Sequence, residues 1–171
     1  QTVFNSAANA NISRVQNVGH IVTRGLEAVY NGYHLWLPGL DLSASVTYAD
    51  STIRENAGFV STPGDTIGKR QPNIPRWRAT LLAAYRWSPE WSSTVAMRHS
   101  GKQFNTLNNS DTNGYAYMGV SAFTTVDVRA RWQIDPRWSA AFGIDNLTNQ
   151  TYWNFHPYPQ RSYTAELKAR F

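Results

Sequence analysis

Apolar and polar side chains alternate strictly along the last ten residues of the chain, Ser162 to Phe171. Tyr163, Ala165, Leu167, Ala169 and Phe171 share one face, while the alternate positions all carry a hydroxyl or a charge. Because successive side chains of a β-strand point to opposite sides of the sheet, the segment predicts a strand with one apolar and one polar face. Soluble β-sandwiches alternate in the same way, so the class of fold depends on how often the chain repeats the pattern.

The alternation recurs along most of the chain and is sharpest at residues 126–134. There Asp127, Arg129 and Arg131 alternate with valine, alanine and tryptophan. No soluble core would accept that charged face, so we expect the apolar neighbours to meet lipid and the charges to meet water. The pattern predicts eight strands, the first of them cut short: about residues 1–6, 18–30, 40–49, 77–87, a segment from Trp91 onward, 126–134, 138–145 and 162–171.

Short and long connections alternate between these segments. The short ones are Pro38-Gly39, 88–90 and 135–137, and the long ones are 51–75, 105–121 and 146–161. Outer-membrane barrels combine short periplasmic turns with longer extracellular loops, so the sequence predicts an all-β fold, an antiparallel transmembrane β-barrel. Five tryptophans beside the short turns would form a periplasmic aromatic belt: Trp36, Trp87, Trp91, Trp132 and Trp138.

Two of the short turns lie in similar stretches of sequence. Residues 86–92 read RWSPEWS, and residues 131–139 read RWQIDPRWS. We interpret this near repeat as one hairpin arrangement used twice, which requires no duplicated domain.

Composition fits a membrane wall better than a soluble core. Aromatic residues make up 13% of the 171 residues, yet the mean hydropathy is negative. No apolar run reaches about eighteen residues, which excludes a transmembrane helix but not tilted strands of about 9 to 11 residues. The net charge of +5 is scattered along the segments, so nucleic acid is not expected as a partner. The absence of cysteine excludes disulfides and thiolate metal sites.

The C-terminal third carries a more specific signal. Residues 142–152, FGIDNLTNQTY, followed by PYPQRSY at 157–163 and by Leu167 and Phe171, resemble the C-terminal signature of TonB-dependent outer-membrane receptors of the siderophore-receptor type. Residues 17–28 and 73–77 are similar to a mid-barrel strand and a loop-to-strand junction of that family. Gln160 departs from the pattern, since many relatives carry glycine there.

The resemblance implies a 22-stranded barrel with an N-terminal plug, in the outer membrane of a Gram-negative bacterium. Such a receptor binds a scarce metal chelate, above all a ferric siderophore, and releases it inward when TonB pulls on the plug. Residues 1–171 would form the last eight strands, with no plug domain and no signal peptide present. The implied partners are outer-membrane lipid, the chelate, the TonB system through the missing plug, and the barrel-assembly machinery, which would read Tyr163, Leu167 and Phe171. No cofactor is implied.

Aromatic and basic side chains of the third long loop are the candidates for ligand contact, because ring faces and cations suit anionic or aromatic chelates. Rim aromatics are also expected in any such barrel. The four histidines have no metal-site spacing, and no phosphate loop or nucleophile elbow is present, so neither a metal site nor an enzyme is predicted. The candidates are Tyr152, Trp153, Phe155, His156, Tyr158 and Arg161.

Charged residues of the polar faces are expected to form cross-strand pairs and plug contacts: Glu27, Asp127, Arg129, Arg131, Asp145, Glu166 and Lys168. Two other classes of protein remain open from the residues alone. One is a complete small eight-stranded outer-membrane barrel with a structural or enzymatic role, and the other is a soluble all-β binding module. The ligand also stays open, since haem, cobalamin, a copper chelate or a glycan would suit a related receptor.

Overall fold

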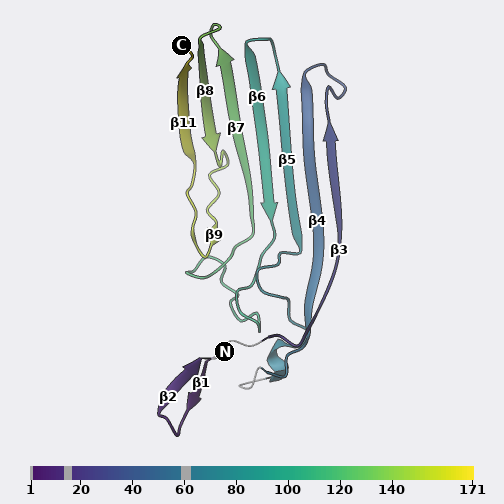
Figure 1. Ribbon diagram of the computed structural model, residues 1–171, viewed down its shortest axis with the longest axis vertical. Helices are drawn as coiled ribbons and strands as arrows, with labels where there is room; N and C mark the ends of the chain where they lie inside the picture. Colours follow the sequence, from purple (N-terminus) through teal and green to yellow (C-terminus); the bar gives the residue numbers. More distant parts are fainter. Residues whose placement is uncertain (1, 14–16, 59–62) are drawn as a thin grey trace.

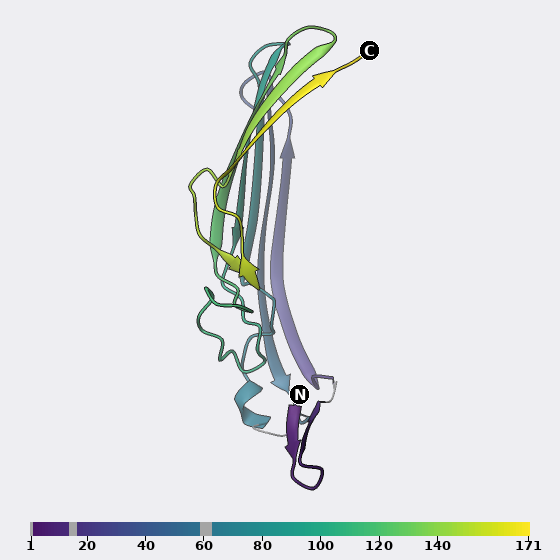
Figure 2. The same cartoon turned by 90° about the vertical axis from the view of Figure 1, so that its left-hand side faces the viewer.

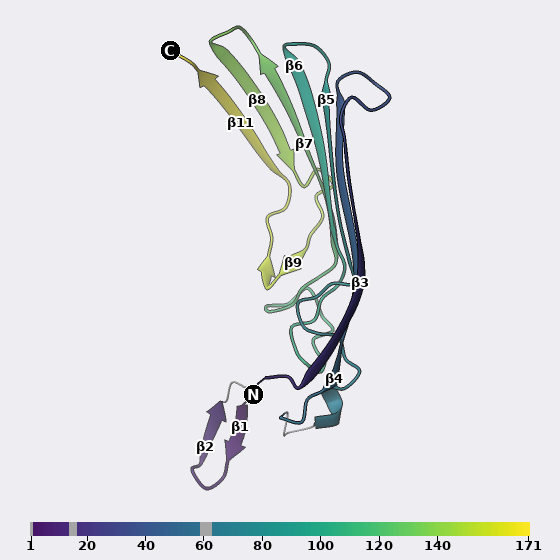
Figure 3. The same ribbon diagram turned by 45° about the vertical axis from the view of Figure 1, so that its right-hand side comes forward.

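Seven antiparallel strands form one curved sheet in the computed structural model (Figures 1 and 3). The structure describes residues 2–13, 17–58 and 63–171. Along the sheet the strands follow the order β11, β8, β7, β6, β5, β4, β3, so every neighbour in the sheet is also a neighbour in the chain of these seven strands. Their bounds are β3 His20–Gly32, β4 Leu40–Glu55, β5 Trp77–Arg86, β6 Trp91–Ser100, β7 Phe123–Gln133, β8 Trp138–Asp145 and β11 Ser162–Ala169.

Two small hairpins and one helical turn complete the described part of the chain. β1 (Thr2–Asn5) pairs with β2 (Ala10–Ser13), β9 (Trp153–Asn154) pairs with β10 (His156–Pro157), and a 3₁₀ turn η1 covers Pro63–Thr66. Within the described residues, no helix has the length and apolar character needed to cross a membrane.

The seven-stranded sheet contains seven of the eight predicted strands. Thr2–Asn5 is a strand, as expected, but it belongs to the separate β1–β2 hairpin and not to the seven-stranded sheet (Figure 1). The Asn5 side chain closes this hairpin locally, since its Oδ1 accepts hydrogen bonds from the N–H groups of Ala7 and Ala8 at 3.0 and 3.2 Å. The segment therefore satisfies its own backbone with a nearby partner. Gln1 lies outside the described residues.

The other seven predicted strands are confirmed, and one of them is longer than expected. β4 continues to Glu55, through residues that we predicted to open an exposed loop at 51–75. Residues 69–71 run beside the end of β4: the Ile53 N–H donates to the Lys69 carbonyl at 2.9 Å, and the Gln71 N–H donates to the Ser51 carbonyl at 3.0 Å. This later segment supplies the backbone partners that a protruding strand would otherwise lack.

The strand register collects apolar side chains on one face of the sheet, called the outward face below. Leu26 lies opposite Tyr48, and Tyr48 opposite Trp77, so large apolar side chains stand side by side across three strands. Many of them, including Leu26 at 81% and Leu167 at 65%, are exposed. The remaining cross-strand pairs carry the same face to the far edge: Leu81 with Met97, Val95 with Val128, Val128 with Ile144, and Ile144 with Tyr163.

The short turns all lie at one end of the sheet, with the C-terminus, and the long loops lie at the other end with the N-terminal hairpin (Figures 1 and 2). The repeated hairpin arrangement is confirmed. The Ser88 hydroxyl accepts hydrogen bonds from the N–H groups of Glu90 and Trp91, both at 3.2 Å. Asp135 Oδ1 accepts from Arg137 and Trp138 at the same relative positions, at 2.7 and 2.8 Å.

Candidate functional site

The polar face of the sheet, opposite the outward face, is crossed by ion pairs between neighbouring strands. Arg86 on β5 pairs with Asp41 on β4 at 2.9 Å, and Arg98 on β6 pairs with Asp127 on β7 at 3.1 Å. Hydroxyl pairs such as Ser45 with Thr80, at 2.7 Å, fill the spaces between them. The face is therefore a hydrogen-bonded wall suited to water rather than to lipid.

Arg129 on β7 connects three strands of this wall. Its guanidinium donates to Asp145 on β8 and to the Thr164 hydroxyl on β11, each at 2.8 Å. Gly143 lies directly opposite both Arg129 and Thr164 in the register, and a Cβ at Gly143 would overlap the guanidinium. Glycine at this position thus leaves the space through which the arginine reaches across β8.

The expected cross-strand pairing of the polar-face charges holds for three of the seven residues, Asp127, Arg129 and Asp145. The other four form no ion pair within the described residues. They leave two carboxylates and two cations on the wall: Glu27, Arg131, Glu166 and Lys168.

At the other end of the sheet, loop 146–161 packs against loop 101–122 through backbone hydrogen bonds. The Met118 N–H donates to the Phe155 carbonyl, and the Phe155 N–H donates to the Gly119 carbonyl, both at 2.9 Å. The Ser121 N–H donates to the Trp153 carbonyl at 3.0 Å, while the Trp153 N–H donates to the Ser121 hydroxyl at 2.9 Å. The two loops therefore form one body, although about thirty residues separate them in the sequence.

Tyr152, one of the six ligand candidates, is a packing residue of this loop body. Its side chain is 6% exposed and lies between the rings of Phe123, at 4.5 Å, and Tyr158, at 5.0 Å. Burial raises the pKa of the Tyr152 phenol above its ordinary value. A ligand would not reach this ring without displacing the rings beside it.

Three of the remaining candidates lie on the β9–β10 hairpin. The rings of Trp153 and His156 both meet the ring of Tyr117 edge-on, at 5.5 and 5.9 Å between centroids. Phe155 occupies the turn between them with a φ of +64°. The hairpin thus presents an aromatic group that is shared with loop 101–122.

The last two candidates lie on the return to β11. Tyr158 is 43% exposed beside the buried Tyr152. Arg161 is exposed, and its N–H donates to the Asn149 side chain at 3.0 Å. The side chain of Arg161 forms no ion pair within the part of the chain that the structure describes.

Sequence reasoning missed Tyr117, which is 74% exposed and joins Trp153 and His156. It also missed a cavity of about 300 Å³ within loop 101–122, lined in part by Asn105, Asp111, Tyr117 and Met118. Burial disfavours the charged form of Asp111, but hydrogen bonds from the Thr106 hydroxyl and from backbone N–H groups outweigh it and hold the pKa of Asp111 below its usual value. No local pattern marks these residues in the sequence.

Loop 56–76 joins the same body through Asn109. The Asn109 side chain accepts from the Arg70 N–H at 2.8 Å and donates to the Arg70 carbonyl at 3.0 Å. The Asn73 N–H donates to the Phe104 carbonyl at 2.8 Å. All three long loops are therefore tied together at one end of the sheet.

The five belt tryptophans are exposed at the short-turn end. Trp91 and Trp132 stack across β6 and β7 with a centroid distance of 5.3 Å and an interplanar angle of 6°. The Trp87 indole N–H donates to the Ser93 hydroxyl at 2.9 Å. Such rings have an apolar body and a polar edge, which suits a membrane interface.

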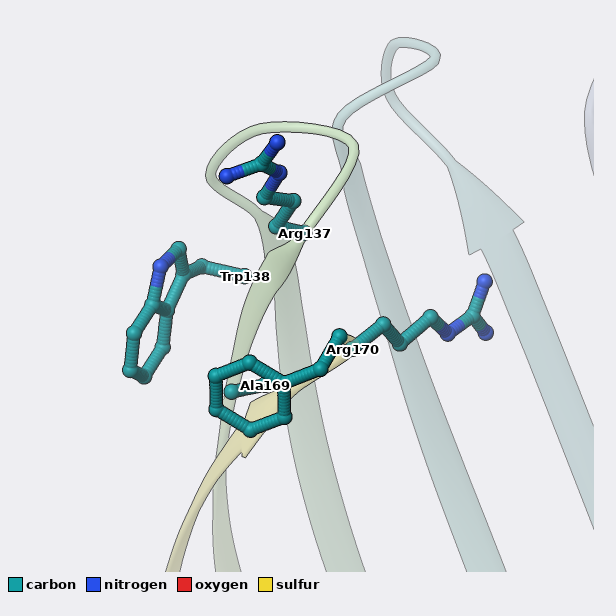
Figure 4. Close-up of a pocket in the computed structure, with 5 residues that line it drawn as sticks. Arg137, Trp138, Ala169 and Arg170 are labelled. Atoms are coloured by element: carbon teal, nitrogen blue, oxygen red, sulfur yellow. The ribbon is translucent and has the colours of Figure 1, made fainter.

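Tyr163 and Leu167 lie on the same face of β11, and both are exposed, as is the terminal Phe171. Tyr163 stacks on Phe142 of β8 at 6.4 Å. A pocket of about 290 Å³ lies beside Phe171 at the sheet edge, with Arg137 in the adjoining turn. Figure 4 shows Trp138 and Arg170, which also line it, pointing in opposite directions, as the two faces of the sheet require. No group of three His, Cys, Asp or Glu side chains that could hold a metal occurs among the described residues.

Known proteins with similar sequences share the barrel segment. The family model described as TonB dependent receptor-like, beta-barrel, matches residues 1–147. A curated relative, the probable TonB-dependent siderophore receptor PiuA of Acinetobacter baumannii, is 25% identical over 144 residues, which cover 80% of this chain and 18% of the relative. The chain thus spans about one fifth of the length of the curated relative that it matches.

Solved structures of receptors share the fold. The siderophore receptor PiuA from Acinetobacter baumannii gives a TM-score of 0.66 at 22% identity, over 85% of this chain and 20% of that one. The unliganded ferric citrate transporter FecA gives 0.65 at 20% identity, over 80% and 22%. The ferripyoverdine receptor of Pseudomonas aeruginosa, bound to ferripyoverdine, gives 0.62 at 20% identity, over 87% and 19%.

Proposed function

The chain belongs to the TonB-dependent receptor-like β-barrel family, and from that premise we propose that it is part of an outer-membrane receptor that takes up a metal chelate. The proposed ligand is a ferric siderophore, and the proposed energy source is TonB. The relatives are named as receptors and transporters, which accords with a role in uptake rather than in catalysis. Residues 1–171 would form the C-terminal part of a 22-stranded barrel.

The observation that carries this proposal is the division of one sheet into a largely apolar face and an ion-paired polar face. A wall of this kind separates lipid from a water-filled interior. The outward side chains, Leu26 and Leu167 among them, are too exposed for a soluble β module. The edge strands β3 and β11 do not pair with each other within the described residues, and in hydrocarbon both edges would need partners. Further strands of a larger barrel would supply these partners. The open edges therefore favour part of a larger barrel over a complete eight-stranded barrel.

The proposed orientation follows from the two ends of the sheet. The long loops would face the outside, and the tryptophans beside the short turns would mark the periplasmic interface. Four wall charges have no ion-pair partner in the part of the chain that the structure describes and are suited to hold a plug domain inside the barrel: Glu27, Arg131, Glu166 and Lys168. The exposed tail of Tyr163, Leu167 and Phe171 would be the segment that the barrel-assembly machinery recognises.

We place the chelate at the outer loop body. Trp153, His156 and Tyr117 present an aromatic group, while Arg161 supplies a cation without a carboxylate partner among the described residues. Phe155 lies in the turn of the same hairpin, and Tyr158 packs on the buried Tyr152 in the segment that follows. Aromatic faces and guanidinium groups suit an anionic catecholate or carboxylate chelate.

The proposal is tested with the full-length receptor in cells that lack other iron-uptake receptors. A panel of radiolabelled ferric siderophores identifies the ligand by binding and uptake. For the siderophore that binds, the Trp153→Ala, His156→Ala and Arg161→Gln triple variant is expected to weaken binding by about 10- to 100-fold, since a few aromatic and arginine contacts carry most binding energy. Tyr115→Ala is the matched control, because Tyr115 is an exposed tyrosine of the same loop body.

Two results would contradict the proposal. If none of the ferric, haem, copper or cobalamin chelates binds or enters through the intact receptor, chelate uptake is excluded. If a chelate enters but the triple variant binds it as tightly as Tyr115→Ala does, the uptake function stands and the assignment of these loop residues is wrong.

A further inference from the structure

Arg24, on the outward face of β3, and Arg70 and Arg76, from the loop before β5, form an arginine cluster at the loop end of β3 and β4. Tyr48 is the outward residue of β4 next to this cluster, toward the middle of the sheet. Its ring packs against that of Trp77 with 4.8 Å between the centroids, as in an aromatic pair at a membrane interface. The next outward position along β4 is Asp50, whose register partner on β3 is Arg24. The cluster therefore begins where the apolar face ends, at the height of lipid headgroups in the proposed orientation.

Asp50 is the only carboxylate that pairs with this cluster within the described residues. Arg76 contacts it at 3.3 Å, with both side chains about half exposed. Arg24 stands beside it as its cross-strand neighbour, close enough for the side chains to interact. One negative charge is therefore surrounded by more positive charge than it can neutralise.

Arg70 adds a third guanidinium that is firmly held. Arg70 forms a β-bridge with Thr52, two residues beyond Asp50 on β4, and bridge partners share a face. Its guanidinium lies 4.7 Å over the Phe104 ring, and Asn109 binds its backbone on both sides. Burial, followed by repulsion from Arg76, lowers the pKa of Arg70, although the group remains charged at neutral pH.

We infer that Arg24, Arg70 and Arg76 form a binding site for the phosphate groups of a phosphorylated lipid headgroup in the outer leaflet. The inference rests on the proposed outer-membrane orientation, but it concerns the outside of the wall and not the chelate site. Guanidinium groups bind phosphate with paired hydrogen bonds, and Arg70 is positioned before any ligand arrives. A second anion beside Asp50 would relieve the repulsion among the three cations.

The test uses the full-length receptor in phosphatidylcholine nanodiscs that contain lipid A, a diphosphorylated glycolipid. Bound lipid is counted by native mass spectrometry. The Arg24→Gln and Arg70→Gln double variant is expected to lose affinity by at least about tenfold, since hydrogen bonds to charged groups are among the strongest in proteins. Lys69→Gln is the matched control, because Lys69 adjoins Arg70 in a strand-like segment and so lies on the other face.

A second variant guards against loss of affinity through misfolding. Asp50→Asn removes the one competing carboxylate and is expected to increase lipid A affinity, an outcome that a damaged barrel would not give. Exposed ion pairs contribute little to stability, so this variant should fold. Heat-modifiable migration on denaturing gels shows whether the barrel of each variant is folded.

Several outcomes would overturn the inference. The first is that the double variant binds lipid A as tightly as Lys69→Gln does, and the second is that Asp50→Asn shows no gain in affinity for lipid A. The third is that the receptor binds dephosphorylated lipid A as tightly as lipid A. The fourth is that inorganic phosphate displaces lipid A completely and binds with the same affinity. Measuring chelate uptake by the same variants distinguishes a failure of this inference from a failure of the proposed function. If the double variant loses uptake while it keeps lipid A, the arginines serve the chelate instead.

Discussion

The two ends of the sheet are built in different ways. At the short-turn end, Ser88 and Asp135 each bind backbone N–H groups two and three residues ahead. At the loop end, Asn109 binds Arg70 across 39 residues, and Ser121 binds Trp153 across 32. The turn end is thus specified by local sequence, while the loop end depends on contacts between segments that are far apart in the chain.

The largest expected effect is at Tyr152, which packs between two rings inside the loop body. Tyr152→Ala should destabilise the packing of loops 101–122 and 146–161 by about 3 kcal/mol, because it removes a buried aromatic ring. Hydrogen exchange should rise at residues 118–121 and 153–155 together, and not at the short turns. Tyr152→Phe is the control, since it keeps the ring. Exchange that rises in one loop alone would show that the loops do not form one body.

Asn109 tests the link to the third loop. Asn109→Ala leaves the Arg70 N–H and carbonyl without their side-chain partner, at a cost of about 1–3 kcal/mol. Hydrogen exchange and protease cleavage should increase at residues 69–71, far from the substitution in sequence. Asn108→Ala serves as control, because within the described residues its side chain accepts a hydrogen bond from the Ser110 N–H, two residues away, and not from another loop. Equal effects of the two variants would mean that the long-range link contributes nothing.

Asp135 tests the opposite claim for a short turn. Asp135→Ala removes two hydrogen bonds to backbone N–H groups and should destabilise the turn by about 1–2 kcal/mol. Exchange should increase at residues 135–138 only. Asp135→Asn keeps an acceptor oxygen and should retain most of the protection. A change in the loop body would contradict the independence of the two ends.

The smallest expected effect is a response of the loop end to acid. The pKa of Asp111 is lowered in the folded chain, so its contribution is complete above the unfolded-state pKa of about 3.9 and is lost as the pH falls through the lowered value. Protease cleavage within residues 105–112 should therefore increase in strong acid. Asp111→Asn should weaken this dependence, and cleavage near Ser88 should not follow the same titration.

The difference between the ends also explains what the sequence predicted. The strands β5, β8 and β11 begin at the predicted residues, Trp77, Trp138 and Ser162, because a period of two and the residues of a tight turn are both local signals. The repeated turn was visible for the same reason. A one-residue shift in the register of these strands would move every one of their side chains to the opposite face of the sheet.

What could not be predicted depends on distant partners. The extension of β4 to Glu55 needs residues 69–71 beside it. The burial of Tyr152 needs Phe123, and the aromatic group of the candidate site needs Tyr117 from another loop. The first predicted strand forms, but it pairs with β2 in a separate hairpin, a partner that alternation does not reveal.

The stacked indole rings of Trp91 and Trp132 have a spectroscopic consequence for the pairing of β6 with β7. Two nearly parallel rings 5.3 Å apart are close enough for their electronic transitions to couple, and circular dichroism is sensitive to such coupling. A slip of one residue between β6 and β7 would place the rings on opposite faces and abolish the coupling. The protein therefore carries its own spectroscopic reporter of correct strand pairing, readable during membrane insertion without any added label.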